Sequence, residues 1–262
     1  MLSCSAGEEW CRTQSEAFTR ETGINVRMTR KSSGETFAQI KAEAGQPRGD
    51  VRWGGTGDPH LQAAQEGLTE EYRSPMLADL QPWAVTQAEA AGFRTVGLYA
   101  GAVGFGYNST MVTENPPACW KDLLDARFKD DVRVANPNSS GTSHTMLATM
   151  VHLMGEDGAF AYPKDRHANI SQYTKSGSVP IRAAATGETA IGIVFMHDAV
   201  VEAVGGAPIV TVAPCEGTGY QVGSMSIIKG GPNPEAAKIW HDWALSAKAQ
   251  EIGATARSFQ VP

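Results

Sequence analysis

A strand-like run, a Ser-Ser-Gly turn and a helix-like run follow one another twice in this chain of 262 residues. Residues 24–29 lead into Ser32-Ser33-Gly34, and residues 132–135 lead into Ser139-Ser140-Gly141-Thr142. Apolar residues at helical spacing follow both turns, so each turn is expected at the N-terminus of a helix. Hydroxyls and unpaired N–H groups there can bind an anion, although Ser and Gly also simply cap helices. The recurrence favours two anion-binding loops.

Strands alternate with helices from the start of the chain, which predicts parallel β-α-β units and the α/β class. An amphipathic helix is expected over residues 8–22, ended by Gly23 in a left-handed conformation. Residues 24–29 and 50–53 are then expected to form strands. Near the end of the sequence, Asn233-Pro234 has the pattern of a helix start, with Asn as the cap and Pro in the first turn.

Two extended, glycine-containing runs, residues 98–107 and 209–217, are suited to carry the chain from one lobe to another and back. The segment between them is long enough to be an inserted domain. We therefore expect residues 1–100 as the first part of lobe 1, residues 101–221 as lobe 2, and residues 222–262 as the second part of lobe 1.

The composition restricts the class of protein. Hydrophobic residues make up 42% of the chain and charged residues 19%, as in a soluble globular protein, and no apolar run is long enough to cross a bilayer. The net charge of -6 and the lack of a Lys/Arg block argue against nucleic acid as a partner. A small anion is not excluded, because Arg30, Lys31, Lys175 and Arg182 lie next to Ser/Gly loops.

The four cysteines do not have the spacing of a zinc site. A local disulfide between Cys4 and Cys11 is plausible, and whether Cys119 and Cys215 pair is left open. No signal peptide is visible at the N-terminus, so we expect that a leader was removed and replaced by an initiator methionine.

A buried strand is expected over residues 190–196, and His197-Asp198 follows it directly. Ligands of open α/β sheets collect at the carboxyl ends of strands, which favours a binding role for this pair. In the alternative, Asp198 caps a helix and His197 is a structural histidine whose ring nitrogens are hydrogen-bonded within the protein. Glu216 lies in the second extended run, at the expected second crossover between the lobes. A carboxylate near a histidine can accept hydrogen bonds from sugar hydroxyls. The sequence is equally compatible with Glu216 as a solvated carboxylate in a loop.

Two further loops could contribute to a ligand site. Gly54-Gly55-Thr56-Gly57 follows a strand, where the backbone can approach a ligand closely, and Asp58 is expected to cap the next helix. The pattern is neither a P-loop nor a dinucleotide fingerprint, so ATP and NAD are not expected. Ser176-Gly177-Ser178 precedes a helix that Pro180 could open.

Enzymatic interpretations find little support. The chain contains neither G-x-S-x-G nor H-E-x-x-H, so neither a serine hydrolase of the α/β type nor a zinc protease is indicated. His197, Asp198 and Glu216 could ligate a metal with help from His144, but their spacing matches no strong template. We expect no catalytic residues, no resident metal and no cofactor.

Several short motifs occur in an order that resembles the solute-binding proteins of bacterial ABC importers, in particular their ferric-iron-binding-like branch. These motifs cover residues 3–8, 29–35, 53–58, 106–108, 188–192 and 227–230, followed by Asn233-Pro234. The resemblance implies a monomeric periplasmic receptor with a two-lobed, hinge-closing fold. It also implies a ligand held between two mostly parallel sheets flanked by helices, as in the type II-like members, and delivered to a permease in the inner membrane.

Within this family, ferric-binding members hold iron through neighbouring tyrosines, but this chain has no Tyr-Tyr pair. His197-Asp198 and the run Cys215-Glu216-Gly217-Thr218-Gly219-Tyr220 resemble instead the binders of phosphorylated sugars such as hexose 6-phosphates. The alternatives are a ferric-ion receptor and a metal-dependent phosphate-ester hydrolase. Family members usually continue for several tens of residues beyond Val261-Pro262, so the C-terminal tail is expected to be truncated.

The resemblance and the residue patterns together divide the expected site in two. A phosphate dianion needs N–H and O–H donors, whereas neutral hydroxyls need acceptors. The residues expected to hold the phosphate are Arg30, Ser32, Ser33, Ser139, Ser140, Gly141, Thr142 and Ser176. The residues expected to hold the sugar are Gly55, Thr56, His197, Asp198 and Glu216.

Overall fold

The computed structural model describes residues 1–255, and these residues form two compact units. Unit 1 contains residues 1–100 together with the described residues from Val222 on, and unit 2 contains Gly101–Gln221. Each unit has a sheet flanked by helices, which confirms the α/β class. Val261 and Pro262, on which the expectation of a truncated tail rests, lie outside the described residues.

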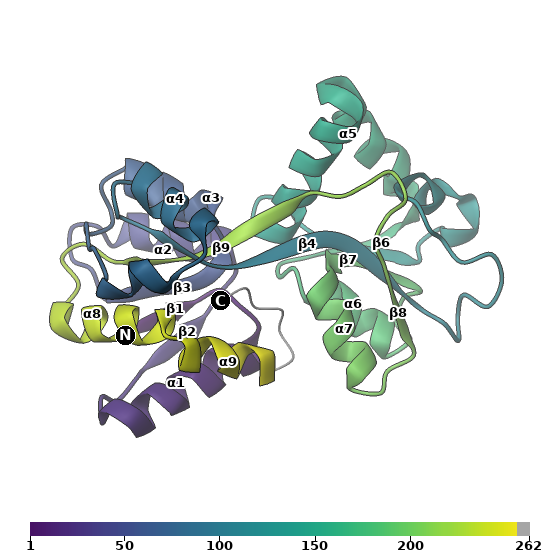
Figure 1. The fold of residues 1–262 in the computed structure, drawn as a ribbon. Helices are drawn as coiled ribbons and strands as arrows, with labels where there is room; N and C mark the ends of the chain where they lie inside the picture. Colours follow the sequence, from purple (N-terminus) through teal and green to yellow (C-terminus); the bar gives the residue numbers. More distant parts are fainter. Residues whose placement is uncertain (256–262) are drawn as a thin grey trace. The chain divides into compact units, whose positions relative to one another are not determined.

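The sheet of unit 1 has the strand order β2-β1-β3-β9, with β1 parallel to β2 and β3, and with β9 antiparallel to β3. Helices α1, α8 and α9 lie on one face of this sheet and α2, α3 and α4 on the other (Figure 1). Strands β4 and β9 continue across the unit boundary along the chain. The elements of unit 1 are β1 (Leu2–Cys4), α1 (Glu8–Thr22), β2 (Met28–Arg30), α2 (Ser33–Ala42), β3 (Val51–Thr56), α3 (Asp58–Gln65), η1 (Pro75–Asp79), α4 (Pro82–Ala90), the start of β4 (Val96–Asn108), most of β9 (Tyr220–Ile227), α8 (Pro234–Leu245) and α9 (Ala247–Thr255).

An aromatic cluster fills the core of unit 1. Helix α1 begins with acidic residues, which its N-terminal dipole favours, and ends at Gly23 with φ of 73°, as expected. Its buried face contributes Trp10, whose ring centroid lies 4.6 Å from that of Trp53, and Phe18, 4.8 Å from Trp240. Such contacts add to the free energy of area burial. A disulfide between Cys4 and Cys11 joins β1 to α1.

Local signals placed some elements of unit 1 wrongly. The predicted strand over residues 24–29 is mostly loop, because the short strand β1 pairs only with Met28–Arg30. Asp58 is the first residue of α3 and Gly57 is the cap, so the predicted capping role of Asp58 is wrong. Asn233 does precede α8 as its cap residue, with Pro234 as the first helical residue.

The sheet of unit 2 has the order β4-β7-β5-β6, with β8 paired to β4. Helix α5 covers one face and α6 and α7 the other (Figure 1). The strands β5, β6 and β7 are mutually parallel, and β4 is antiparallel to β7. The elements of unit 2 are the rest of β4, η2 (Trp120–Leu124), η3 (Ala126–Phe128), β5 (Val132–Ala135), α5 (Gly141–Arg166), η4 (His167–Asn169), β6 (Ile170–Thr174), α6 (Val179–Ala185), β7 (Ile191–Phe195), α7 (Met196–Val204), β8 (Ile209–Val212) and the start of β9.

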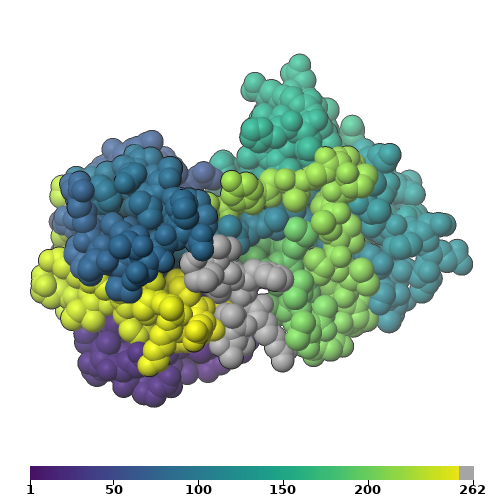
Figure 2. Space-filling model, viewed as in Figure 1, coloured from purple at the N-terminus to yellow at the C-terminus, as the bar shows by residue number. Residues whose placement is uncertain are grey.

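Helix α5 is only partly a core helix. Met146 and Met150 on its first turns are buried, but Val151 and Met154 are about two-fifths exposed. The apolar residues expected at helical spacing after the second Ser-Ser-Gly turn thus form a buried face only as far as Met150. The helix is interrupted at Gly155, whose φ is 73°. In the space-filling view, α5 projects from the surface of unit 2 (Figure 2). Within residues 1–255, no helix combines the length and apolarity needed to cross a membrane.

Candidate functional site

The parallel strands of unit 1 bring the predicted residues of its loops to one edge of the sheet. Strands β1, β2 and β3 are parallel, so their carboxyl ends lie at the same edge. Arg30 ends β2, Ser32 and Ser33 follow it, and Gly55 and Thr56 end β3. We call Ser32, Ser33, Gly55 and Thr56 the unit 1 loop cluster. Arg30 lies beside it and donates from Nε to the Ala6 carbonyl at 3.2 Å.

The hydroxyls of Ser32 and Ser33 are engaged inside the protein. Ser32 is the cap residue of α2 and forms a capping box with Glu35, whose carboxylate lies 2.7 Å from Ser32 Oγ. Ser33 Oγ accepts a hydrogen bond from the N–H of Thr56 at 3.1 Å. Both serines are buried. What this cluster can offer an anion is therefore chiefly the backbone N–H groups in the first turn of α2.

Gly55 permits a close approach between β3 and α2. Its φ is +81°, and a Cβ at this position would lie 2.5 Å from Ser33 Oγ and 2.6 Å from Ser5 Cβ. Neither the backbone conformation nor the space suits a side chain. The N–H of Gly55 donates to the Tyr99 hydroxyl at 2.9 Å. Glycine in the Gly54-Gly55-Thr56 run is therefore required by packing within unit 1.

A buried arginine lies directly beneath the unit 1 loop cluster. Arg52 is 0% exposed and donates to the carbonyl oxygens of Ser33 and Pro59, each at 2.9 Å. Burial lowers the pKa of Arg52 to about 9, so the guanidinium is still charged at neutral pH. Among residues 1–255, no carboxylate pairs with it. The sequence analysis missed Arg52, although an arginine between Val51 and Trp53 inside an expected strand is itself a signal.

His60 packs near Arg52 without adding charge. It is completely buried, and its ring nitrogens lie 2.8 Å from Ser226 Oγ and 3.1 Å from the Gly54 carbonyl. Burial, assisted by the nearby charge of Arg52, lowers the pKa of His60 well below its usual value. Because His60 is neutral, Arg52 supplies the positive charge at this place.

The parallel strands of unit 2 also gather the predicted residues at one edge. Strand β5 lies between β7 and β6, and the loops that follow these three strands contain residues 136–140, 175–178 and the start of α7. We call Ser139, Ser140, Gly141, Thr142 and Ser176 the unit 2 loop cluster. Ser139 Oγ donates to the Lys175 carbonyl at 2.9 Å. A Cβ on Gly177 would lie 2.0 Å from Thr142 Oγ1, so the two loops are in close contact.

Ser140 and Thr142 differ from the serines of unit 1. Ser140 is the cap residue of α5, and Gly141 is its first residue. Ser140 is 2% exposed and Thr142 8%, yet within the described part of the chain neither hydroxyl has a hydrogen-bond partner. Neither oxygen is among the fully buried polar atoms without a partner, so both hydroxyls reach solvent and are suited to a ligand at the positive end of α5.

His197 and Asp198 lie in the first turn of α7. Phe195 is the cap residue, so the alternative in which Asp198 caps the helix is wrong. The His197 ring stacks on Phe195 with centroids 5.5 Å apart, and a Cβ on Gly101 would lie 3.0 Å from its Cε1. The two side chains are 17% and 21% exposed. The contacts with Phe195 and Gly101 hold the His197 ring in place, and both side chains remain accessible at the same sheet edge as the unit 2 loop cluster.

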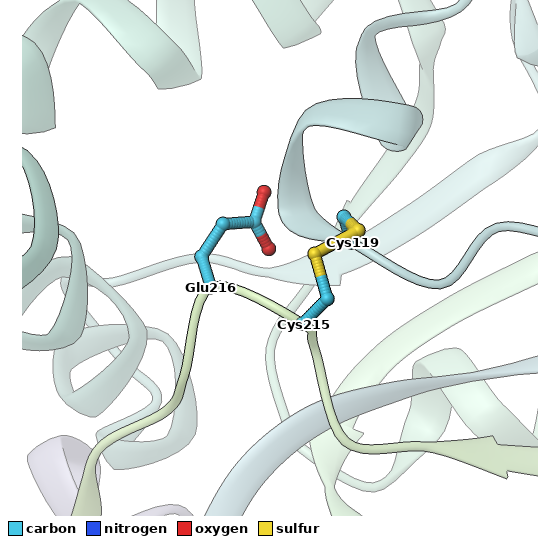
Figure 3. A group of neighbouring side chains, drawn as sticks. All are labelled: Cys119, Cys215 and Glu216. Carbon is cyan, nitrogen blue, oxygen red and sulfur yellow. A yellow bond between two sulfur atoms is a disulfide. The ribbon is translucent and has the colours of Figure 1, made fainter.

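Glu216 has a structural role in unit 2. Its carboxylate oxygens accept hydrogen bonds from the N–H groups of Trp120, at 2.7 Å, and Lys121, at 3.0 Å, at the start of η2. Cys119 and Cys215 form a disulfide beside it (Figure 3). Metals bind thiolates, so these two cysteines and Glu216 cannot together form a metal site while the disulfide is intact. Glu216 is thus a helix cap, which the sequence analysis did not consider.

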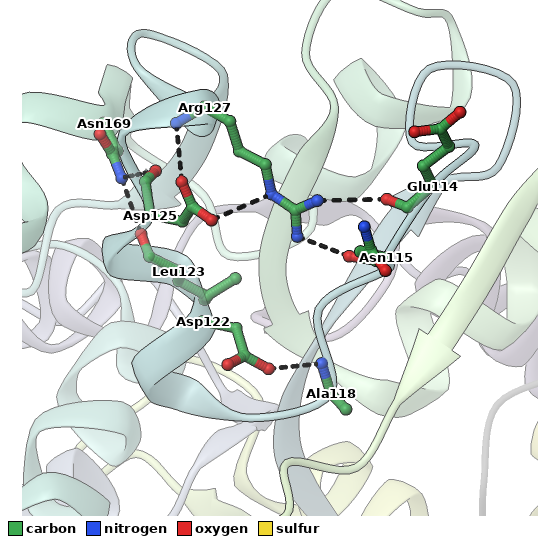
Figure 4. Close-up of polar contacts among 8 residues, drawn as sticks. All are labelled: Glu114, Asn115, Ala118, Asp122, Leu123, Asp125, Arg127 and Asn169. Atoms are coloured by element: carbon green, nitrogen blue, oxygen red, sulfur yellow. Dashed lines mark hydrogen bonds and ion pairs between the residues drawn. The ribbon is translucent and has the colours of Figure 1, made fainter.

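The chain around η2 is fixed by further side chains (Figure 4). Asp122 accepts from the N–H groups of Ala118 and Cys119, each at 2.9 Å. Arg127 donates to the carbonyl oxygens of Glu114 and Asn115. Asn169 similarly donates to the carbonyl oxygens of Leu123 and Asp125. Glu216 is therefore one member of a set of contacts that orders this segment.

Residues 57–262 match the family model of the bacterial extracellular solute-binding proteins. The chain belongs to this family. An uncharacterized protein of Haemophilus influenzae is 44% identical over 256 residues, which cover 96% of this chain and 74% of that protein. The family assignment confirms the predicted resemblance and makes this chain the solute-binding component of an ABC importer. Such components bind a small solute and an inner-membrane permease.

Solved structures show the same fold. The periplasmic binding protein AfuA of Actinobacillus pleuropneumoniae, with exogenous fructose-6-phosphate bound, is 43% identical with a TM-score of 0.95, over 99% of this chain and 83% of that one. Iron-bound HitA of Pseudomonas aeruginosa is 20% identical with a TM-score of 0.82, over 100% and 85%. The predicted two-lobed periplasmic-binding-protein fold is therefore confirmed, while the likeness to HitA concerns the fold alone.

Proposed function

We propose that this chain is a periplasmic receptor for a phosphorylated sugar such as a hexose 6-phosphate, and that it works without catalysis. The observation that carries the proposal is the pair of hydroxyls of Ser140 and Thr142 at the N-terminus of α5, which reach solvent and have no hydrogen-bond partner among the described residues. A dianion accepts several hydrogen bonds at once, and this position offers hydroxyls, N–H groups and the helix dipole. The fructose-6-phosphate bound to AfuA supports the choice of ligand class.

Different side chains bind the phosphate group and the sugar hydroxyls of the ligand. The unit 2 loop cluster holds the phosphate, while the Asp198 carboxylate and the His197 ring accept hydrogen bonds from sugar hydroxyls. The unit 1 loop cluster and Arg30 contribute donors to the same phosphate, with the hinge closure that the family resemblance implies. Since the carboxylate of Glu216 already caps η2, we assign no sugar contact to it.

A thermal-shift screen tests the proposal. The ligands are hexose 6-phosphates, the free hexoses, inorganic phosphate, and a ferric salt with citrate. A ligand at one hundred times its dissociation constant stabilises the folded form by about 2.7 kcal/mol. We expect hexose phosphates to shift the melting temperature more than inorganic phosphate, and free hexoses to have no effect.

Two outcomes of the same screen would overturn the proposal. A shift with ferric citrate but none with any phosphate ester would indicate an iron receptor. Release of inorganic phosphate from a hexose phosphate during incubation would indicate a hydrolase. Asp198→Asn serves as the matched variant, because it should reduce the advantage of hexose phosphates over inorganic phosphate and leave the response to phosphate itself.

A further inference from the structure

Arg52 is a charge that the fold of unit 1 does not neutralise. Its side chain is completely buried, its Nε has no hydrogen-bond partner, and the two bonds it makes go to neutral carbonyl oxygens. An isolated buried charge is costly, and proteins normally pair it with a carboxylate. Among the residues that the structure describes, no aspartate or glutamate forms an ion pair with Arg52. An anion bound nearby would supply the missing negative charge.

The contacts of Arg52 lead to the first turn of α2. The carbonyl that accepts from its Nη2 belongs to the Ser33–Gly34 peptide, and the N–H of that peptide is in the helix N-terminal turn, where intrahelical acceptors are lacking. A charged donor on a peptide oxygen polarises the peptide and makes its N–H a stronger donor. Thus the guanidinium strengthens the group that the unit 1 loop cluster can present to an anion.

A second buried polar group without a hydrogen-bond partner lies in the same cluster. Thr56 is 3% exposed and its Oγ1 has no hydrogen-bond partner, while its N–H is fixed to Ser33 Oγ. The second guanidinium bond, to the Pro59 carbonyl, extends to the first turn of α3. The positive ends of two helices and one uncompensated cation therefore occur together, an arrangement that favours negative charge.

We propose that Arg52 is a positioning residue that makes the unit 1 loop cluster prefer a doubly charged group over a singly charged one. The inference rests on the proposed function and specifies it: the receptor selects phosphate esters against sulfate esters of the same shape. Arg52 acts through the Ser33–Gly34 peptide and through its charge, without touching the ligand.

The experiment compares hexose 6-phosphate with hexose 6-sulfate by isothermal titration calorimetry at pH 8, where the first carries two charges and the second one. Arg52→Gln keeps hydrogen-bond donors and removes the charge, whereas Arg52→Lys keeps the charge. Arg94→Gln is the matched control, because Arg94 also donates to a backbone carbonyl in unit 1, that of Thr69, outside the loop cluster.

We expect wild type, R52K and R94Q to share a strong preference for the phosphate ester. R52Q should lower the ratio of the two affinities about tenfold, because the lost Coulomb attraction scales with the ligand's charge. If R52Q lowers the affinity for both esters equally, or if R52K behaves like R52Q, Arg52 only stabilises the fold through its hydrogen bonds and the inference is wrong. If wild type binds neither ester, the proposed function fails first, and this inference fails with it.

A measurement on the wild type covers the case in which R52Q does not fold. In ¹H–¹⁵N spectra, the Gly34 amide proton should move downfield when hexose 6-phosphate binds, and less with hexose 6-sulfate. A Gly34 signal that does not respond to a bound phosphate ester would also overturn the inference.

Discussion

The same Ser-Ser-Gly sequence is used differently in the two units. In unit 1, Ser32 is part of a capping box and Ser33 accepts the N–H of Thr56. In unit 2, the hydroxyls of Ser140 and Thr142 have no hydrogen-bond partner among the described residues and reach solvent. A charged guanidinium, that of Arg52, lies beneath the first turn of α2. One unit thus offers polarised backbone and the other offers side-chain hydroxyls.

This difference separates two ways of building an anion site from one motif. Internal hydrogen bonds make the unit 1 loop cluster rigid, so its substitutions should affect stability before binding. In the unit 2 loop cluster, the hydroxyls of Ser140 and Thr142 make no internal hydrogen bond among the described residues, so substitutions of these two residues should affect binding before stability.

The largest difference is expected for a methyl group added to the glycine of each cluster. Gly55→Ala places a Cβ 2.5 Å from Ser33 Oγ at a φ of +81°, and should lower the free energy of unfolding by about 3 kcal/mol. Gly177→Ala presses on the side chains of Thr142 and Ser140 and on no backbone atom among its three nearest contacts, so it should cost about 1 kcal/mol and weaken phosphate binding about tenfold. Denaturant titration and calorimetry measure the two quantities.

Gly45→Ala is the control for this comparison, because no atom lies within 4 Å of the added Cβ. It should leave both stability and binding unchanged. Equal losses of stability in G55A and G177A would contradict the distinction between the clusters.

Removing one hydroxyl from each cluster should have smaller effects than the glycine substitutions. The loss should fall on stability in unit 1 and on phosphate binding in unit 2. Ser33→Ala leaves the buried N–H of Thr56 without an acceptor and should cost about 1–2 kcal/mol of stability. Thr142→Val should leave stability within about 0.5 kcal/mol and weaken phosphate binding about tenfold. Loss of stability in T142V, together with unchanged phosphate affinity, would show that Thr142 is a packing residue.

Substitutions of Glu216 and Asp198 in unit 2 should likewise have different effects, one on stability and the other on binding. Glu216→Gln weakens the cap of η2 and should cost about 1 kcal/mol of stability with little effect on affinity. Asp198→Asn should weaken hexose phosphate binding about fivefold at unchanged stability. A large loss of affinity in E216Q would show that Glu216 contacts the sugar, as its sequence motif suggested, and would contradict the structural role.

The smallest expected effect is a pH dependence that belongs to unit 1. Burial lowers the pKa of both His60 and His241, so the unfolded state binds protons first as the pH falls. The stabilising contribution is present above the unfolded pKa of about 6.5 and is lost below it, by about 0.7 kcal/mol for His60 between pH 7 and pH 6, and His241 adds a loss of the same sign. Denaturation at the two pH values should show this loss, and His60→Gln should reduce it. An unchanged pH dependence in H60Q would contradict the assignment.

Local signals were sufficient for much of the fold. The end of α1 at Gly23, the strand Val132–Ala135 and the start of α8 at Asn233 each depend on residues adjacent in sequence, and each was predicted. The strand expected over residues 24–29 is short because its length is set by β1, a distant partner in sequence.

The candidate site depended more on tertiary contacts. Loop positions at strand ends could be predicted, since parallel strands fix which loops meet. The role of Glu216 could not, because the N–H groups it caps belong to residues about a hundred positions earlier. Arg52 was missed for the same reason: its neutral partners on α2 and α3 come together only in the folded unit.

Calorimetric titration of the wild-type protein with hexose 6-phosphate, inorganic phosphate and free hexose tests the central claim most directly. The account predicts that the phosphate ester binds more tightly than either of its two parts, because donors of the unit 2 loop cluster and acceptors at His197 and Asp198, which lie at one edge of the unit 2 sheet, act on one molecule. Equal affinity for inorganic phosphate and the ester, or binding of ferric ion with no binding of either, would contradict it.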